Sequence, residues 1–256
     1  MPTAALSIDV PSGPLKWTDF GGPIVKPELK AGDRAWAVVP VSAGWDTLKF
    51  SLLTVDRVEG DDAVFSSAAD KRAIFVPGAF VSAAKPAQGL AKGDTVAVAE
   101  KDSRAIARVT SVDGGKVKVR FRYAGDIQEL ELDPSEVVKL DGTLKFGAPA
   151  GFSDTRDQPG GQPKTEWHPA YFVQTAEDKT WVVTTTGKPH RLAASNVKPL
   201  GIHVAHKAGD KVWVANGELL VEGQVTAIED DGLRYKVKVG TEETSLPFES
   251  VSTPVK

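Results

Sequence analysis

The sequence predicts an all-β protein made of four successive copies of one small barrel. A short phrase recurs along the chain, as Ala-Gly-Asp at 31–33 and 208–210 and as Lys-Gly-Asp at 92–94. Each phrase opens a stretch in which apolar and polar residues alternate, interrupted by glycine and aspartate pairs. An alternation with a period of two is typical of antiparallel hairpins. Self-similarity along a chain further indicates a repeat architecture.

The last copy, residues 207–251, shows the expected elements in order. Its Gly-Asp opener leads into a strand around 212–214, and a second strand covers 221–228. The turn Asp-Asp-Gly follows at 230–232, and the alternation resumes over 233–239. A final phrase, LPFESV, places one helical turn before a short closing strand. This order predicts a meander of about five short strands.

The other copies repeat these elements, and their closing phrases agree best. The four closures read FVPGAFV, LDPSEVV, LAASNV and LPFESV, each with an apolar residue, a polar or proline-containing turn and a valine. The third copy lacks the Gly-Asp opener but matches the last copy in its second half. A unit of roughly fifty residues with about five strands indicates a small SH3-type barrel, whose closure leaves few exposed edges.

Taken together, the openers, acidic turns and closures resemble those of the Tudor and agenet members of the SH3-like superfold. Repeats of those families likewise open with Gly-Asp-x-Val/Cys-x-Ala and pass through strand, acidic turn and strand before a short helical turn. The resemblance covers about 29–256 and implies tandem Tudor-like barrels. Because such small units bury little surface alone and the linkers are short, we expect the barrels to pack together.

The repeats define the expected domain boundaries. These are an N-terminal arm over 1–28, barrel 1 over 29–86, barrel 2 over 87–141, barrel 3 over 142–202 with an inserted loop over 148–169, and barrel 4 over 203–256. The arm is expected either to be a tail or to dock its aromatic residues on a barrel. The inserted loop is expected to be either functional or mobile, since long loops commonly are one or the other.

Composition limits the classes of function. A net charge of −3 provides no basic field for nucleic acid or anionic lipid. The lack of cysteine excludes disulfides and thiolate metal sites. No apolar stretch is long enough to span a membrane, and the first residues lack the features of a signal peptide. We therefore expect a cytoplasmic protein without a membrane partner.

The motifs of common enzyme classes do not occur in the sequence. It contains no GxGxxG, no GxxxxGK[ST] and no HExxH. His203 and His206 form an HxxH pair, but a metal site would need further ligands, and we expect both to be partly exposed in a linker. The sequence therefore predicts no catalytic site, no metal site and no cofactor.

Aromatic residues supply the main candidates for partner binding. In the opener strands the core positions flank Trp36 and Trp213, which should therefore face outward in barrels 1 and 4. The family resemblance implies an aromatic cage at the following loop, but only barrel 1, with Trp45, has an aromatic residue there, so the sequence does not predict a complete cage. Three more aromatic residues gather in the third copy: Trp167, Tyr171 and Trp181. These six residues are the candidates for contact with a protein partner. For Trp36 and Trp213 the sequence favours the alternative, in which they pack barrel against barrel or against the N-terminal arm.

A basic row is the clearest charge feature. The stretch KVKVRFRY places four cations on one face of a strand: Lys116, Lys118, Arg120 and Arg122. The next strand, DIQELELD, places three carboxylates outward beside them: Glu129, Glu131 and Asp133. Opposite charges on neighbouring strands predict a ladder of ion pairs. The alternative is a groove for nucleic-acid phosphates.

These features predict a non-enzymatic protein-interaction or assembly module, a scaffold of Tudor-like repeats. Two alternatives remain at this stage: a nucleic-acid-binding protein that uses the basic row, and a purely structural subunit of a larger assembly. A protein partner is favoured over nucleic acid because the expected ladder neutralises the basic row. The sequence indicates neither the oligomeric state nor whether a methylated side chain is bound.

Overall fold

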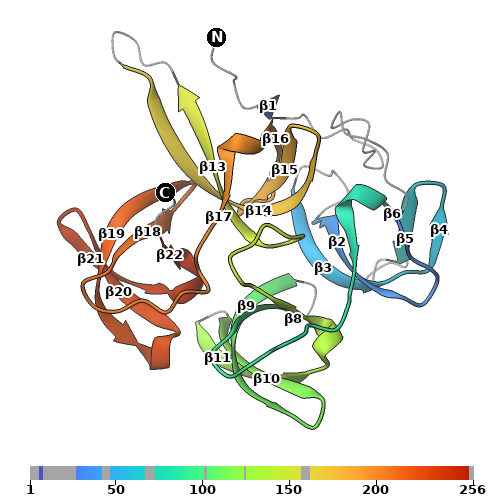
Figure 1. Cartoon of the computed structure of the whole chain (residues 1–256), viewed down its shortest axis with the longest axis horizontal. Coiled ribbons are helices and arrows are strands. Elements are labelled where there is room, and N and C mark those ends of the chain that lie inside the picture. The colour runs from blue at the N-terminus through green and yellow to red at the C-terminus, as the bar shows by residue number, and fades with distance from the viewer. Residues whose placement is uncertain are drawn as a thin grey trace.

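The computed structural model of the chain is all-β, as the sequence predicts (Figure 1). It describes residues 6–7, 27–41, 47–66, 73–100, 103–123, 125–156 and 162–253. Within these ranges the strands pair antiparallel, and the helical segments are short 3-10 turns. None of the helical segments described is long and apolar enough to cross a membrane.

Barrel 2 shows the unit in its simplest form. Its elements are β8 (Thr95–Glu100), β9 (Ser103–Asp113), β10 (Lys116–Tyr123), β11 (Asp126–Leu132), the 3-10 turn η3 (Pro134–Glu136) and β12 (Val137–Lys139). The sheet order is β11-β10-β9-β8-β12, so the last strand pairs with the first. Alternate residues such as Val96, Val117 and Phe121 are fully buried in the interior. The sheet thus curls around a core of its own.

Barrel 4 repeats this plan. Its elements are β18 (Lys211–Asn216), β19 (Leu219–Glu229), η5 (Asp230–Gly232), β20 (Arg234–Val239), β21 (Glu242–Pro247), η6 (Phe248–Ser250) and β22 (Val251–Ser252). The order β21-β20-β19-β18-β22 is that of barrel 2. The turn predicted at 230–232 is therefore the connection between its second and third strands.

Barrels 1 and 3 are variations on the same unit. Barrel 1 contains β2 (Arg34–Pro40), β3 (Leu48–Thr54), β4 (Arg57–Glu59), β5 (Asp62–Ser66), β6 (Ala73–Pro77), η2 (Gly78–Phe80) and β7 (Val81–Ala83). Its second strand is interrupted at Val55–Asp56, which divides the barrel into two three-stranded sheets. Barrel 3 contains β13 (Pro149–Arg156), β14 (Lys164–Ala176), β15 (Lys179–Thr184), β16 (Pro189–Ala193), η4 (Ala194–Asn196) and β17 (Val197–Pro199). A two-residue strand, β1 (Leu6–Ser7), adds a sixth member to the barrel-3 sheet.

The recurring Gly-Asp phrase is a tight turn that ties the start of each barrel to its second strand. In barrel 2, Gly93 has a φ of 92°, which favours glycine. The Asp94 carboxylate accepts the N–H of Ala91 at 2.8 Å, and its carbonyl accepts the N–H of Val109 at 2.9 Å. Barrels 1 and 4 make the same bonds. Barrel 3 keeps the turn with Gly147 but lacks the aspartate.

A bulge bends the second strand at equivalent places in barrels 2 and 4. The pairing of β9 with β10 skips Thr110, and that of β19 with β20 skips Thr226. Each skipped threonine donates its hydroxyl to a carbonyl of the third strand at 3.2 Å, from Lys118 in barrel 2 and Lys236 in barrel 4. Because bulges increase strand bending, they let a short meander close on itself.

The barrels share their cores in pairs. The barrel-1 core continues into barrel 3 through Val173, Trp181 and Val183. The barrel-4 core takes in Ala97 and Ile106 from the outer face of barrel 2. As a result, the four barrels form a compact cluster and are not arranged in an extended row (Figure 1). The prediction of small barrels packed together is confirmed.

The expectation of an inserted loop over 148–169 is wrong for most of that range. β13 pairs with β14 from Pro149 with Tyr171 to Arg156 with Lys164, which forms a long hairpin. The alternation of apolar and polar residues typical of a strand is not visible here, because the polar residues Asp154 and His168 occupy inward positions where apolar core residues are expected. Residues 157–161 lie outside the described ranges, as does most of the N-terminal arm.

Candidate functional site

Trp36 is covered, contrary to the exposure expected for a partner contact. Its side chain is 4% exposed, and it lines a cleft together with Val137 and Val138 of barrel 2 and Phe146 of barrel 3. An ion pair between Arg34 and Glu136 joins barrels 1 and 2 at 3.6 Å. The alternative that Trp36 packs barrel against barrel therefore describes its position.

The other aromatic candidates lie at different places. Trp213 is half-buried against Trp167, with ring centroids 5.3 Å apart, so this pair joins barrel 4 to barrel 3. Tyr171 lies 5.7 Å from the Phe50 ring of barrel 1, centroid to centroid. Trp181 is 2% exposed within the shared core of barrels 1 and 3. Trp45 lies outside the described residues. The aromatic residues described thus form inter-barrel contacts, and they do not converge on one surface.

The basic row of barrel 2 is paired, as the ladder predicts. Glu131 lies opposite Lys118, and Glu129 lies opposite Arg120, in the register of β10 with β11. Their ion pairs measure 3.5 and 3.7 Å, and Lys116 pairs with Asp133 at 2.8 Å. The row is therefore neutralised along its length.

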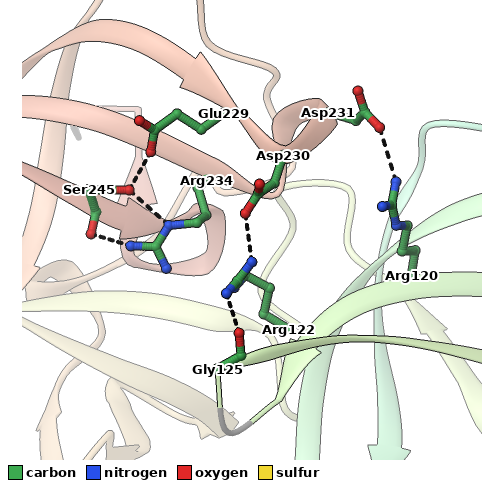
Figure 2. Close-up of polar contacts among 8 residues, drawn as sticks. All are labelled: Arg120, Arg122, Gly125, Glu229, Asp230, Asp231, Arg234 and Ser245. Atoms are coloured by element: carbon green, nitrogen blue, oxygen red, sulfur yellow. Dashed lines mark hydrogen bonds and ion pairs between the residues drawn. The ribbon is translucent and has the colours of Figure 1, made fainter.

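Two of its arginines also cross to barrel 4, which the sequence did not indicate. Arg122 pairs with Asp230 at 2.6 Å, and Arg120 pairs with Asp231 at 3.1 Å; Figure 2 shows both contacts as dashed lines. Arg122 additionally donates to the carbonyl of Gly125 in its own hairpin. This arginine clamp, defined as Arg120 and Arg122 with Asp230 and Asp231, fixes barrel 2 against barrel 4.

In the HxxH pair His203 is partly exposed, as expected, whereas His206 is buried. His206 is 5% exposed and contacts the Tyr235 ring edge-on, with centroids 5.5 Å apart. The carbonyl of His203 accepts a hydrogen bond from Arg108 of barrel 2 at 3.3 Å. Burial lowers the pKa of both histidines. No group of three or more potential metal ligands occurs among the residues that the structure describes.

Polar side chains from several strands meet instead at the mouth of barrel 3. A cavity of about 240 Å³ lies there, with Phe152 and Pro169 as apolar lining. Its polar lining comes from four elements: Asp154 on β13, His168 on β14, Thr184 on β15 and His190 on β16, joined by Thr185, Thr186 and Lys188 from the β15–β16 turn and by Glu218 from barrel 4. We call this the mouth pocket.

The strand registers explain why these side chains converge. His168 pairs directly with Phe152, and His190 pairs directly with Val182, both of which belong to the barrel-3 core. Directly paired residues lie on the same face of a sheet, so both imidazoles lie on the inner face. The Phe152 ring is stacked on His168 at 4.9 Å and lies 5.2 Å from His190.

Each histidine has one buried ring nitrogen without a hydrogen-bond partner among the described residues. These atoms are Nε2 of His168 and Nδ1 of His190. His168 Nδ1 lies 2.8 Å from the Glu218 carbonyl oxygen, which can only accept, so Nδ1 carries the proton. In the neutral His168 ring, Nε2 is then an acceptor without a donor. Buried polar atoms of this kind are rare and call for a ligand or solvent.

The charges of the mouth pocket favour a cation. Burial is the main cause that lowers the pKa of His190, and nearby His168 and Lys188 lower it further, so this ring is neutral at neutral pH. Asp154, which is 8% exposed, and Glu218 contribute two negative charges against the positive charge of Lys188. Lys188 itself lies 3.9 Å from Glu218.

Sequence reasoning missed the mouth pocket because its residues come from separate strands. A signal was present in the alternation, since Asp154 and His168 fall in phase with Phe152 and Ala170. Polar residues at inward positions near a strand end predict an open, polar mouth. Nothing in the sequence indicated that Glu218 lines the cavity, because its position depends on how barrel 4 packs on barrel 3.

The comparisons with known proteins do not assign the chain to a family. No family model matches the sequence, and no curated protein matches it. A solved structure of the four MBT repeats of Drosophila melanogaster Sfmbt, in complex with a peptide carrying a methylated lysine, aligns with 94% of this chain and 95% of that chain. The identity is 9% and the TM-score is 0.17, values too low to transfer a fold or a ligand.

Proposed function

We propose that the chain is a non-enzymatic protein-interaction module whose mouth pocket receives one basic side chain of a partner protein. The observation that carries this proposal is the pair of unpartnered imidazole nitrogens, one each on His168 and His190, that line the same cavity as the buried Asp154 carboxylate. Together these groups offer acceptors and negative charge to an incoming donor.

The size of the pocket supports a side chain as the ligand. Sites for whole small molecules usually measure about 300–1,000 Å³. The mouth pocket, at about 240 Å³, falls below that range. A single side chain that enters from an extended partner fits this volume, while the rest of the partner lies on the surface around it.

Hydrogen-bond polarity supports a cation over an anion. Lysine and arginine carry N–H donors and no acceptor. They complement the lone pair of His168 Nε2 in its neutral ring and the carboxylate of Asp154. A carboxylate or phosphate ligand would instead lie against Asp154 and Glu218, where like charges repel.

The same groups support a binding role over catalysis. A nucleophilic hydroxyl needs an adjacent base within hydrogen-bond reach. The two unpartnered nitrogens contact no hydroxyl, and the Thr184 hydroxyl contacts the Thr186 hydroxyl at 2.9 Å and the Lys188 N–H at 3.0 Å. The nucleic-acid alternative loses its main support, because the cations of the basic row are paired.

The proposal is tested with N-acetylarginine amide, N-acetyllysine amide and N-acetylglutamate amide titrated into the ¹⁵N-labelled chain. We expect the two basic amides to shift the NMR signals of His168 and His190, and the glutamate amide to leave them unchanged. Asp154→Asn should weaken binding of the basic amides by about tenfold or more, since hydrogen bonds to charged groups are worth about 1.5–3 kcal/mol.

The variant Lys116→Gln, which alters an exposed ion pair far from the pocket in the fold, serves as the matched control and should bind like the wild type. Binding of the glutamate amide in place of the basic amides would contradict the proposal, because it would make the pocket an anion site.

A further inference from the structure

The N-terminal strand β1 occupies the outer edge of β16 (Figure 1). Leu6 pairs with Arg191, and Ser7 pairs with His190. His190 is also a lining residue of the pocket. A backbone segment that joins this edge therefore passes directly beside the cavity.

Among the residues described, β1 is the only strand paired with this edge of β16. β16 pairs with β15 over five residues, from Pro189 to Ala193, but with β1 over two. In barrels 2 and 4 the corresponding fourth strands, β11 and β21, are the outer members of their sheets. Among the described residues, an added strand on this edge is therefore particular to barrel 3. Unpaired N–H and C=O groups at a sheet edge are a template for another strand.

We propose that the outer edge of β16 is a strand-acceptor site, occupied in cis by Leu6–Ser7 and in trans by an extended partner segment with a basic residue opposite His190. The proposal deepens the function given above and rests on it for the identity of the basic residue. The N-terminal segment then acts as an internal competitor that lowers the apparent affinity for the partner.

The register explains how one partner segment could pair with the β16 edge and also place a side chain in the mouth pocket. Residues directly opposite in an antiparallel pair lie on the same face of the sheet. The residue opposite His190 is therefore on the pocket face, and its neighbours in sequence are on the other face. Backbone pairing along β16 would supply affinity, and the side chain in the pocket would supply specificity, as in other complexes formed by strand addition.

The length of the cis contact explains why a partner could displace it. Within the part of the chain that the structure describes, the outer side of β16 is paired only at His190 and Arg191, and Pro189, Leu192 and Ala193 have no strand partner on that side. A partner strand of five residues would cover the whole edge. Backbone groups of successive residues point to alternate edges of a strand, and Pro189 has no N–H, so the longer strand would gain its backbone hydrogen bonds mainly at Ala193, which faces the same side as Arg191.

The test uses the full chain and two fluorescent peptides. One peptide has residues 1–12 of this chain, and the other carries Ser7→Arg, which places a basic residue opposite His190. The acceptor proteins are the wild type and the double variant Leu6→Pro with Ser7→Pro, whose prolines cannot pair as a central strand does. Fluorescence anisotropy measures the affinity of each combination.

We expect both peptides to bind the proline variant and to bind the wild type about tenfold more weakly, because only the fraction of molecules with a vacant edge is competent. The Ser7→Arg peptide should bind the proline variant more tightly than the native peptide. Adding Asp154→Asn to the proline variant should remove that gain and leave the binding of the native peptide unchanged.

Two results would overturn the strand-acceptor site: no binding of either peptide to the proline variant, or equal binding to the wild type and the variant. A concentration-dependent dimer of the wild type by light scattering, lost in the proline variant, would make a second copy the occupant and overturn the assignment to a partner peptide. If the Ser7→Arg gain survives Asp154→Asn, the mouth pocket as a basic-residue site fails, while the acceptor edge stands.

Discussion

Arg122 of barrel 2 and Asp230 of barrel 4 form an ion pair, with 2.6 Å between Nη1 and Oδ2 (Figure 2). The backbone at Asp230 is left-handed, with a φ of 49°, and so is that of Asp231, at 53°. The equivalent turn of barrel 2 uses glycines in that region, Gly114 and Gly115. Backbone strain of this kind persists where the surrounding structure compensates for it. Here the compensation is the arginine clamp, which holds two barrels together.

The clamp can be measured by a double-mutant cycle with Arg122→Ala and Asp230→Ala. We expect a coupling free energy of unfolding of about 1 kcal/mol, since the two groups are in direct contact but remain partly exposed. Urea denaturation of the wild type, both single variants and the double variant provides the four values. The pair of Lys179 with Asp178 is the control and should couple far more weakly, because the two residues are adjacent in sequence within one barrel and Asp178 is open to solvent. Strict additivity at Arg122 and Asp230 would show that the clamp adds nothing to stability.

Trp36→Ala should destabilise the protein by about 3–5 kcal/mol, the usual cost of removing a buried aromatic side chain. Trp213→Ala should lower the free energy of unfolding by less than Trp36→Ala does, because Trp213 is only half-buried. Trp36→Phe retains most of the buried volume and removes an indole N–H that has no partner among the described residues, so it should keep most of the stability. Thermal and urea unfolding measure all three. A Trp36→Ala protein of wild-type stability would instead support an exposed, partner-binding role for this residue.

The Gly-Asp turns offer a matched comparison between Asp94→Ala and Asp210→Ala. Asp94 accepts a backbone N–H at 2.8 Å and pairs with Lys139 at 2.7 Å, while Asp210 accepts the N–H of Lys207 at 2.7 Å. We expect losses in the free energy of unfolding of about 1–2 kcal/mol for Asp94→Ala and about 1 kcal/mol for Asp210→Ala. Both variants should fold, because barrel 3 forms this turn without an aspartate. Failure of either to fold would show that the carboxylate is needed to form the turn.

Stability should fall as the pH drops below about 6.5, the ordinary pKa of histidine. Burial is the main cause that lowers the pKa of His203 and His206, and Arg108 lowers both further. Asp141 acts in the opposite direction on His203, and Asp210 does so on His206. Between pH 6.5 and the lowered pKa values of the folded state, the unfolded chain therefore binds more protons than the folded protein does. In this interval the free energy of unfolding decreases as the pH falls.

Urea denaturation between pH 7.5 and pH 5 measures this loss, and each histidine can contribute up to about 1.4 kcal/mol per pH unit. The double variant His203→Gln with His206→Gln should show a flatter dependence than the wild type. His190 stays in place in both proteins and contributes equally to both. Parallel curves for the two proteins would place the pH dependence elsewhere in the chain.

Several parts of the fold could be predicted from local sequence. The Gly-Asp phrase predicted the barrel openers because a turn with positive φ needs glycine and a short acceptor next to it. The ladder of Lys118 with Glu131 and Arg120 with Glu129 followed from strand alternation alone. Both features depend on neighbours along the chain or on an adjacent strand, which the residue pattern specifies directly.

The inward polar residues of barrel 3 were harder to interpret. Asp154 and His168 broke the expected apolar alternation, so a strand pair was mistaken for a loop. Strand alternation also left the covering of Trp36 open, because it indicates which face of a sheet a side chain takes but not what covers that face.

The sequence by itself determined the number of barrels, the position of their turns and the two faces of each strand, because these follow from contacts within one unit. Tertiary structure decided which outward faces are buried, how Arg122 meets Asp230, and which strands bring His168 and His190 to one cavity. These contacts join residues from different strands and different barrels, and their formation depends on packing between units that no local pattern encodes.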